Sequence, residues 1–232
     1  MNPTGSVFNE SELREIAKVA LDNNICIIAD EAYDFLVYDN QPYFSLASLS
    51  ELKNNLIAAY SFSKMYCMTG WRVGYLYSNA KIVNQVLKVH DAFAICAPTI
   101  SQYAALVGLR NTNGKNGIGD QCIKNLIAAL SRRRDLLCTR LDQLPELFKY
   151  QKPQGAYYIF PSIVPQKLTS MELALKLLYE AKVITIPGNG FGPTGESHLR
   201  LSFGGTDETI INAMDRIETW TKKNNFPLIH DS

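Results

Sequence analysis

The stretch Ser61–Tyr75, "SFSKMYCMTGWRVGY", places a lysine before a run rich in aromatic and sulfur-containing residues. Such side chains prefer burial, so the stretch is not typical of a surface loop. A buried lysine without a partner is also unfavourable, because its charged amine loses hydration. A lysine in an apolar pocket loses proton affinity, and its neutral amine can then attack a carbonyl to form a Schiff base. Lys64 is therefore a candidate nucleophile, although a lone lysine in a loop is usually solvent-exposed.

Two apolar runs of strand length are followed by side chains that can take part in catalysis or ligand binding. Ile25–Ala29 is followed by Asp30, and Leu56–Tyr60 is followed by Ser61. Continuous apolar runs of this length are typical of strands covered on both faces, as in a parallel sheet. In open α/β sheets, ligands bind at the carboxyl edge of the strands. The acidic residue and the Ser-Lys stretch are therefore expected at a ligand-binding edge.

Helical periodicity and turn residues organise the rest of the chain. Asn9 and Glu12 form a capping-box pattern at the start of a predicted helix that "DNN" ends, and Arg72–Tyr77 alternates like a strand. Further elements are predicted as helices at 81–110 with a break at Pro98, a long helix up to about Leu144, strands near 156–160, 183–186 and 198–203, and helices near 171–181 and 206–224. The Asn/Gly-rich break at 111–120 is a predicted domain boundary or loop.

Composition narrows the class of protein. Of 232 residues, 47% are hydrophobic and 19% charged, and the net charge is +1 with scattered Lys and Arg. These values favour a soluble globular protein and argue against nucleic-acid or membrane-surface binding. The cluster "SRRRD" at 131–135 is predicted to be a solvated helix face. The five cysteines fit buried free thiols in a reducing cytoplasm, with no disulfide framework or metal site expected. Neither a signal peptide nor an apolar run of membrane-spanning length is visible.

Pyridoxal phosphate needs a lysine, an acidic partner for its pyridine nitrogen and a site for its phosphate. Asp30 could keep the ring nitrogen protonated, and Tyr33 could hydrogen-bond the phenolic oxygen of the cofactor. Ser61 and Arg72 could bind the phosphate, where a charge-assisted hydrogen bond contributes roughly 1.5–3 kcal/mol. Taken singly, Asp30 could instead cap a strand-end turn, Tyr33 could be packed, and Arg72 could form a surface ion pair. The whole set, in this order, favours the cofactor site.

The sequence resembles the class I/II aminotransferases of fold type I, the aspartate aminotransferase-like pyridoxal-phosphate enzymes. The resemblance spans essentially the whole chain. It rests on "NPTG" (Asn2–Gly5), "DEAY" (Asp30–Tyr33), "SFSKMYCMTGWRVGY" (Ser61–Tyr75), "QGAYYIFP" (Gln154–Pro161), "VITIPGNGFGPTGE" (Val183–Glu196) and "HLRLSF" (His198–Phe203).

The resemblance implies a role for each matching residue. Lys64 would form the Schiff base with pyridoxal phosphate and shuttle the proton between the substrate α-carbon and the cofactor. Arg200 would pair with the substrate α-carboxylate, a task that suits the planar guanidinium, although it could equally form a structural ion pair. The other implied contacts are Asp30 to the pyridine nitrogen, Asn2 and Tyr33 to the ring hydroxyl, Ser61 and Arg72 to the phosphate, and Asn2 also to the substrate. We also expect the Asn2–Pro3 bond to be cis.

The resemblance also implies an α/β fold with an incomplete large domain. Residues 1–112 would form the carboxyl-terminal part of the pyridoxal-phosphate-binding domain, with a mixed, mostly parallel sheet and helices. Residues 113–150 would be a long connecting helix, and 151–232 a small α/β domain. In the family, "NPTG" lies well inside the large domain, so the upstream portion is expected to be absent. We therefore expect this chain to need that portion, and the full-length form to be a cytoplasmic homodimer. Without it, apolar surface and an open sheet edge are expected.

The expected activity is transfer of an amino group between an amino acid and a 2-oxo acid. A pyridoxal-phosphate lyase and a non-catalytic truncated fragment are alternatives, and the substrate side chain does not follow from the sequence. A remote alternative is a Ser-x-x-Lys acyl transferase, with Ser61 as nucleophile, Lys64 as its base and "YSN" (Tyr77–Asn79) as a second motif. That enzyme class needs a Lys-Thr-Gly strand, which is missing, and a helix at the Ser-x-x-Lys motif, where Gly70 and the aromatic run favour a loop.

Overall fold

The computed structural model describes residues 1–111, 118–164 and 168–224. The chain divides into two compact units, and the division falls within a long helix. The amino-terminal unit is Val7–Ile127, and the carboxyl-terminal unit combines Met1–Ser6 with Ala128–Ser232. Most of the predicted Asn/Gly-rich break lies outside the described residues. The predicted domain limits, 1–112, 113–150 and 151–232, stay a prediction.

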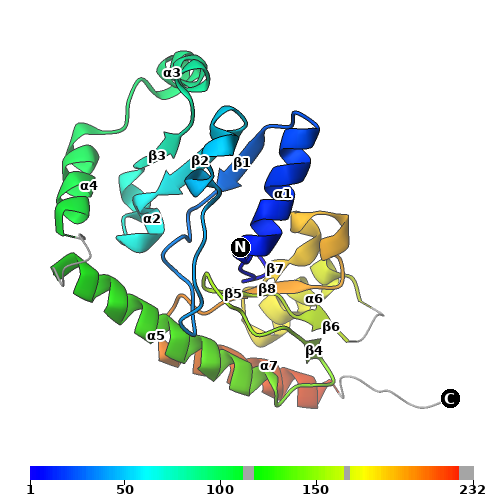
Figure 1. Ribbon diagram of the computed structural model, residues 1–232. Coiled ribbons are helices and arrows are strands. Elements are labelled where there is room, and N and C mark those ends of the chain that lie inside the picture. The colour runs from blue at the N-terminus through cyan, green and yellow to red at the C-terminus, as the bar shows by residue number, and fades with distance from the viewer. Residues whose placement is uncertain (112–117, 165–167, 225–232) are drawn as a thin grey trace. The chain divides into compact units, whose positions relative to one another are not determined.

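The amino-terminal unit is built on a three-stranded mixed sheet in the order β1-β2-β3 (Figure 1). Strand β1 (Ile27–Asp30) is parallel to β2 (Leu56–Ser61), and β2 is antiparallel to β3 (Gly74–Tyr77). Helix α1 (Glu10–Asp22) precedes the sheet. The predicted capping box is confirmed: the Asn9 side chain accepts from the Glu12 amide, and the Glu12 carboxylate accepts from the Asn9 amide. Helix α1, together with a sheet that has one parallel and one antiparallel strand pair, confirms the predicted α/β class and the mixed sheet.

The two faces of this sheet differ in how they are covered. On one face, Leu56 and Ala58 pack with Ala17 of α1 and with leucines of the short 3-10 helices Leu46–Ser48 and Ser50–Asn54. On the other face, Ile28 is 73% exposed. A continuous apolar strand is therefore packed on one face only among the described residues, as expected for an incomplete sheet.

Further helices follow β2 and β3 in this unit. They are α2 (Phe62–Met65), the 3-10 turn Thr69–Trp71, α3 (Ala80–Ala94), α4 (Thr99–Asn111) and the first turns of α5 (Ile118–Leu141). The predicted break at Pro98 is confirmed, because α3 and α4 lie on either side of it. No residue of α3 is buried, and Phe93 is 88% exposed. Within the described ranges, none of the helices combines the length and apolarity needed to cross a membrane.

The carboxyl-terminal unit packs helices against short strands. Its elements are the remainder of α5, β4 (Phe148–Lys149), β5 (Tyr158–Ile159), β6 (Ser162–Ile163), α6 (Ser170–Lys176) with a π-helical turn to Ala181, β7 (Ile186–Pro187), the 3-10 turns Gly188–Phe191 and Pro193–Gly195, β8 (Leu199–Ser202) and α7 (Asp207–Lys223). β8 pairs antiparallel with both β5 and β7, and β4 pairs with β6. The core includes Leu147, Ile159, Leu173, Leu177, Leu199, Phe203 and Ile217.

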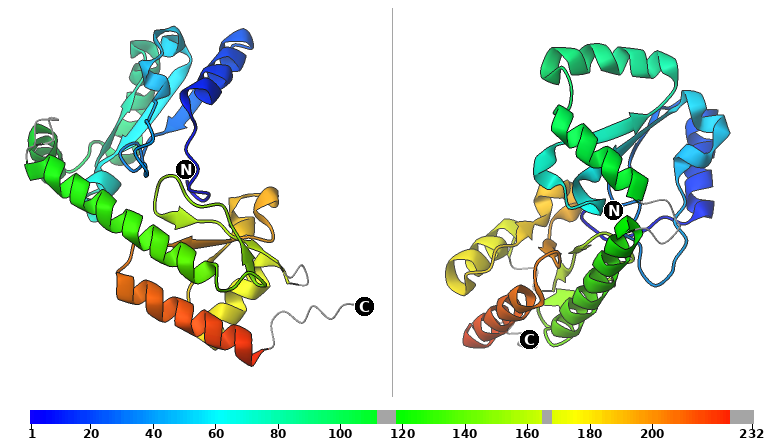
Figure 2. Two further views of the ribbon diagram at one scale, coloured as in Figure 1. Left: turned by 60° about the horizontal axis from the view of Figure 1, so that its bottom comes forward. Right: turned by 90° about the vertical axis from the view of Figure 1, so that its left-hand side faces the viewer.

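The arginine cluster on α5 is only in part the solvated face that the sequence predicted. Arg134 is only 1% exposed, and its Nη1 donates to the Pro153 carbonyl at 3.1 Å. Arg132 and Arg133 both bind the Asp207 carboxylate at the start of α7, which lies alongside α5 (Figure 2). The side chain of Arg132 is 63% exposed, as predicted, but the prediction was wrong for Arg134, because its guanidinium finds a partner far away in sequence, which a local charge pattern does not reveal.

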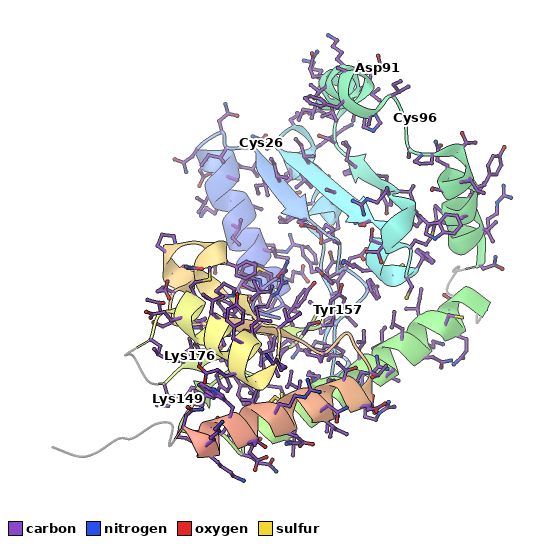
Figure 3. All side chains as sticks on the ribbon, turned by 180° about the vertical axis from the view of Figure 1, so that it is seen from behind. Cys26, Asp91, Cys96, Lys149, Tyr157 and Lys176 are labelled. Atoms are coloured by element: carbon purple, nitrogen blue, oxygen red, sulfur yellow. The ribbon has the colours of Figure 1, made fainter. Side chains whose placement is uncertain are left out.

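The prediction of buried thiols was also wrong for most of the cysteines. Cys138 is buried, but Cys26, Cys67, Cys96 and Cys122 are exposed. Figure 3 shows Cys26 at the start of β1 and Cys96 in the connection between α3 and α4. Apolar neighbours in sequence predicted burial, but a thiol is buried only where a second element packs over it.

Candidate active site

Asp30 and Ser61 lie at the carboxyl ends of the parallel strands β1 and β2. In the strand register Asp30 is opposite Ala59, which is two residues before Ser61, so both side chains are on the same face of the sheet. This is the face on which Ile28 is exposed, opposite the packed core. Asp30 Oδ1 accepts a hydrogen bond from the Ala32 amide at 3.1 Å, so the carboxylate also caps the strand-end turn. Its exposed position leaves this carboxylate accessible from the open face.

Ser61 links β2 to the lysine. It has extended backbone angles, and its Oγ accepts from the Ser63 amide at 3.1 Å, which caps helix α2. Lys64 is half-buried within α2, one turn after this cap. The expectation of a loop here was wrong, because the serine cap begins a short helix directly at the strand end. The expected lack of a helix therefore no longer argues against a Ser-x-x-Lys enzyme. The remaining argument from the motifs is the missing Lys-Thr-Gly strand.

The sulfur and aromatic residues after Lys64 differ in burial. Met68 is buried in a cluster with Phe62 and Val73, against which Tyr66 packs. Cys67 and Trp71 are exposed. The segment is thus anchored by part of its apolar side chains, rather than enclosed by all of them as the sequence suggested.

Arg72 follows this anchored segment and precedes β3. Its backbone is left-handed, with φ 53° and ψ 53°, a conformation that costs a residue with a Cβ roughly 1–2 kcal/mol. The Arg72 Nη1 donates to the Thr69 carbonyl at 2.9 Å, and the side chain is exposed. No ion pair of Arg72 is found within the described ranges. β3 then returns beside Ser61, which is paired with Gly74.

Tyr33 is half-buried in the turn after β1, beside an acidic cluster that sequence reasoning missed. The Glu31 carboxylate accepts hydrogen bonds from the Tyr43 hydroxyl and, at 3.0 Å, from the Ser45 hydroxyl. Burial, opposed in part by a backbone hydrogen bond and assisted by the nearby Glu31 charge, raises the pKa of Asp34 to about 6. The acidic content of "DEAYD" was visible in the sequence, but the phenol and hydroxyl partners come from a later loop.

Asn2 and Arg200 form a second group, in the carboxyl-terminal unit. Arg200 Nη1 donates to Asn2 Oδ1 at 2.8 Å. The Asn2–Pro3 bond is cis, as expected. The Arg200 guanidinium carbon also lies 4.4 Å from the ring centroid of Tyr158 and 5.1 Å from that of Phe191. Sequence reasoning did not assign these two aromatic residues, although both lie within segments that it singled out.

The amino-terminal hexapeptide reaches Arg200 because Gly5 lies against the segment before β5. The Gly5 carbonyl accepts from the amides of Gln154 and Gly155, each at 2.9 Å. Gly5 has φ of +72°, and a Cβ there would lie 2.8 Å from the Tyr158 carbonyl oxygen. The position therefore requires glycine, both for its backbone conformation and for this close approach.

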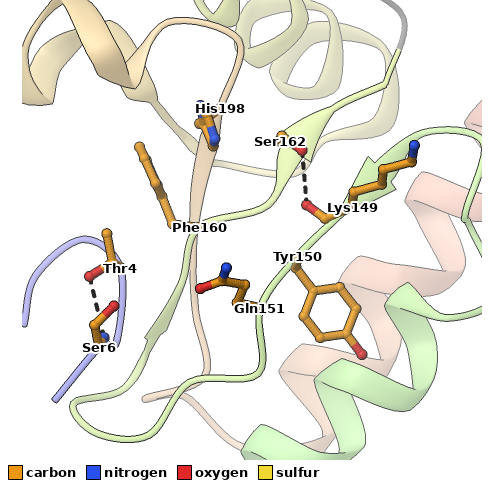
Figure 4. A pocket seen from close by; sticks show the side chains of 8 residues that line it. All are labelled: Thr4, Ser6, Lys149, Tyr150, Gln151, Phe160, Ser162 and His198. Carbon is orange, nitrogen blue, oxygen red and sulfur yellow. Dashed lines mark hydrogen bonds between the residues drawn. The ribbon is translucent and has the colours of Figure 1, made fainter.

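A cavity of about 400 Å³ opens elsewhere in the carboxyl-terminal unit (Figure 4). It is lined by Thr4, Ser6, Lys149, Tyr150, Gln151, Phe160, Ser162 and His198. None of the predicted site residues lines it. The predicted residues thus form two groups, with Asp30, Tyr33, Ser61, Lys64 and Arg72 in the amino-terminal unit and Asn2 with Arg200 in the carboxyl-terminal unit.

Comparison with known proteins assigns the chain to a family. The model of "Aminotransferase class I and II" matches residues 1–217. An aspartate aminotransferase of Pyrococcus abyssi is 37% identical over 219 residues, which cover 94% of this chain and 54% of that protein. An aromatic-amino-acid aminotransferase of Thermococcus litoralis is 37% identical over 224 residues, covering 96% of this chain and 55% of that protein.

A solved structure agrees. The crystal structure of an aromatic aminotransferase from Pyrococcus horikoshii OT3 superposes with a TM-score of 0.89 at 34% identity, covering 97% of this chain and 58% of that chain. The chain thus spans a little over half the length of the relatives that it matches. Sequence motifs, fold and similarity agree that the chain belongs to the class I and II aminotransferase family.

Proposed function

We propose that this chain contributes to a pyridoxal-phosphate-dependent aminotransferase that moves an amino group between an amino acid and a 2-oxo acid. One observation carries the proposal. Asp30 and Ser61 end neighbouring parallel strands on the same open face of the sheet, and Ser61 caps the helix that holds Lys64. These positions support the proposal, because Asp30, Ser61 and the helix that holds Lys64 lie at or directly after the strand ends, which is the edge where ligands bind in α/β sheets.

The chemistry of these side chains fits the cofactor. Asp30 would hold the proton on the pyridine nitrogen, and Tyr33 with Asn2 would hydrogen-bond the ring hydroxyl. Ser61 can donate its hydroxyl proton to the phosphate, because its oxygen, and not its proton, caps α2. When bound, pyridoxal phosphate supplies the electron sink that makes a proton on the substrate α-carbon removable. Lys64 Nζ would anchor the cofactor and then carry that proton.

Arg72 and Arg200 supply two separate positive charges. The Arg72 guanidinium would strengthen phosphate binding through a charge-assisted hydrogen bond. Arg200 would hold the α-carboxylate that amino acids and 2-oxo acids share, while Asn2 occupies one of its five N–H groups. Because this contact reads only the shared carboxylate, it does not select a substrate side chain.

We further propose that the working enzyme is a cytoplasmic homodimer that includes a portion beyond this chain. Support comes from the exposed apolar side chains of the amino-terminal unit, among them Ile28, Phe93, Ile95 and Ile100. Apolar surface of this extent is typical of an interface. Sedimentation of the isolated chain tests this: self-association or precipitation is expected, and a stable monodisperse monomer would contradict it.

Trapping of the cofactor tests the proposed function directly. The chain is incubated with pyridoxal phosphate and reduced with borohydride, and the modified peptide is mapped by mass spectrometry. We expect selective modification of Lys64, loss of this modification in Lys64→Arg, and its retention in the control Lys53→Arg, which changes an exposed lysine of the same unit. Modification spread over many lysines would refute selective cofactor binding by this chain.

Substrate exchange then separates the family reactions. The chain, alone and joined to an upstream segment from a relative, is given one amino acid with several 2-oxo acids. Appearance of the matching new amino acid indicates transamination, whereas release of ammonia or of a side-chain fragment indicates a lyase. Trapping at Lys64 with no turnover in either form would favour the non-catalytic alternative.

A further inference from the structure

The guanidinium of Arg200 lies over two aromatic rings. Its central carbon is 4.4 Å from the centroid of Tyr158 and 5.1 Å from that of Phe191. Tyr158 is on β5 and only 8% exposed, and it is paired with Ser202 on β8, two residues after Arg200. Tyr158 and Arg200 therefore lie on the same face of this antiparallel pair, where diagonal neighbours can touch.

This arrangement restricts the guanidinium without consuming its hydrogen bonds. The N–H groups of a guanidinium point outward in its own plane, so a ring stacked on a face of the group would leave these donors available. One edge is used, because Nη1 donates to Asn2 at 2.8 Å. With two rings within cation–π distance and one N–H group bound to Asn2, rotation of the group is restricted. A carboxylate binding two remaining N–H groups then meets donors that are already oriented.

Phe191 is itself held by a tight turn. The backbones of Gly188 and Gly195 approach so closely that a Cβ on Gly188 would lie 2.0 Å from the Gly195 carbonyl oxygen. The turn is also tied to the start of α6, where the Ser170 hydroxyl accepts from the Asn189 amide at 3.3 Å. The ring is therefore carried by a segment with little freedom to move.

A second pair of rings supports Phe191 from the side. Phe160 meets Phe191 edge-on, with centroids 5.8 Å apart and planes at 89°. Phe160 also stacks on His198, with centroids 4.8 Å apart (Figure 4). Edge-on and offset stacked contacts are the preferred geometries of aromatic pairs. The row from His198 to Arg200 is thus continuous in the carboxyl-terminal unit.

From these contacts we propose that Phe191 and Tyr158 are positioning residues that fix the plane of the Arg200 guanidinium for bidentate binding of a substrate carboxylate. The ligand in this proposal rests on the proposed function, which gives Arg200 the α-carboxylate. The positioning itself concerns only contacts within this chain.

Nuclear magnetic resonance of the full 232-residue chain tests the positioning. The Nε–Hε signal of Arg200, assigned by its loss in Arg200→Lys, is expected to show a ring-current shift and restricted rotation. In Phe191→Leu we expect this signal to move toward that of a solvated arginine. Phe191→Tyr, which restores a ring, should restore the signal. Phe148→Leu makes the same change at a buried site on β4 and should leave the signal unchanged.

Several results would overturn the proposal. They are an unshifted wild-type signal, a signal unaffected by Phe191→Leu, or equal loss in Phe191→Leu and Phe148→Leu, which would reflect general loosening of the core. Failure of Phe191→Tyr to restore the signal would also count against a role for the ring.

Titration with butyrate, with butyramide as the uncharged control, separates this proposal from the proposed function. We expect butyrate alone to shift the wild-type Arg200 signal, and its Kd to rise about three- to tenfold in Phe191→Leu, the range of a partly desolvated cation–π contact. No response of the wild-type signal to butyrate would refute the carboxylate role of Arg200. The Phe191→Leu and Phe191→Tyr variants test the positioning of the guanidinium independently of butyrate. A butyrate Kd unchanged in Phe191→Leu would refute positioning for binding.

Discussion

Replacing Gly5 with alanine is expected to undock the amino-terminal hexapeptide and to release Asn2 from Arg200. Gly5 has φ of +72°, and alanine in this left-handed conformation costs roughly 1–2 kcal/mol. The new Cβ would also lie 2.6 Å from the Pro153 Cβ and 2.8 Å from the Tyr158 carbonyl oxygen, so the backbone must shift. That shift weakens the two hydrogen bonds that the Gly5 carbonyl accepts, each contributing about 0.5–1.5 kcal/mol.

Together these effects give a loss of about 2–5 kcal/mol for docking of the hexapeptide. The amides of Gln154 and Gly155 report on docking directly, because both donate to the Gly5 carbonyl. Their hydrogen exchange should therefore accelerate in Gly5→Ala by about 30-fold or more, the factor that corresponds to 2 kcal/mol. Exchange is followed by nuclear magnetic resonance on the intact chain.

Gly190→Ala is the matched control, because a Cβ at Gly190 meets nothing within 4 Å and the residue lies in the same unit. Its Gln154 and Gly155 amides should exchange at the wild-type rate. The reasoning fails if Gly5→Ala leaves these amides unchanged. It also fails if buried Leu173 exchanges equally faster, since that would indicate unfolding of the whole unit and not local undocking.

Two further predictions concern buried charge. Burial raises the pKa of Asp34 to about 6, so the folded chain holds a proton that the unfolded chain releases between about pH 4 and 6. The free energy of unfolding should therefore fall as pH rises through this range, and urea unfolding followed by Trp71 fluorescence measures it. The Asp34→Asn variant should lose this pH dependence, and equal slopes in the two proteins would contradict the assignment. Arg134→Ala removes the guanidinium that donates to the Pro153 carbonyl and opens a void, so the free energy of unfolding, followed by Trp220 fluorescence, should fall by about 2–4 kcal/mol. The exposed control Arg132→Ala should lower it by less than about 1 kcal/mol. Equal losses in the two variants would refute the argument from burial.

Local patterns predicted the local elements well. The capping box at Asn9, the end of β2 at Ser61 and the break at Pro98 all appear in the structure. Each depends on contacts within a few residues, which the sequence displays directly. The short strands β4 and β6 were missed, because two residues are too few for periodicity to show.

Errors arose where burial depends on distant partners. The arginines of "SRRRD" were predicted to be solvated, yet Arg134 is buried against Pro153, which comes from a later segment. Most cysteines were predicted to be buried, yet Cys67 and Cys96 are exposed. A sequence window shows whether a side chain is apolar, but not whether another element packs over it.

The sequence by itself determined the family and the chemical groups at the carboxyl ends of β1 and β2, because Lys64 and its neighbours form a long specific motif after strand-length apolar runs. Only the tertiary structure decided which groups meet. Asn2 and Arg200 are 198 positions apart, yet they share a hydrogen bond because Gly5 packs against the segment before β5. The rings of Tyr158 and Phe191 meet Arg200 through strand pairing and a glycine turn. Such contacts follow from chain closure and packing over long sequence separations, and no local pattern encodes them.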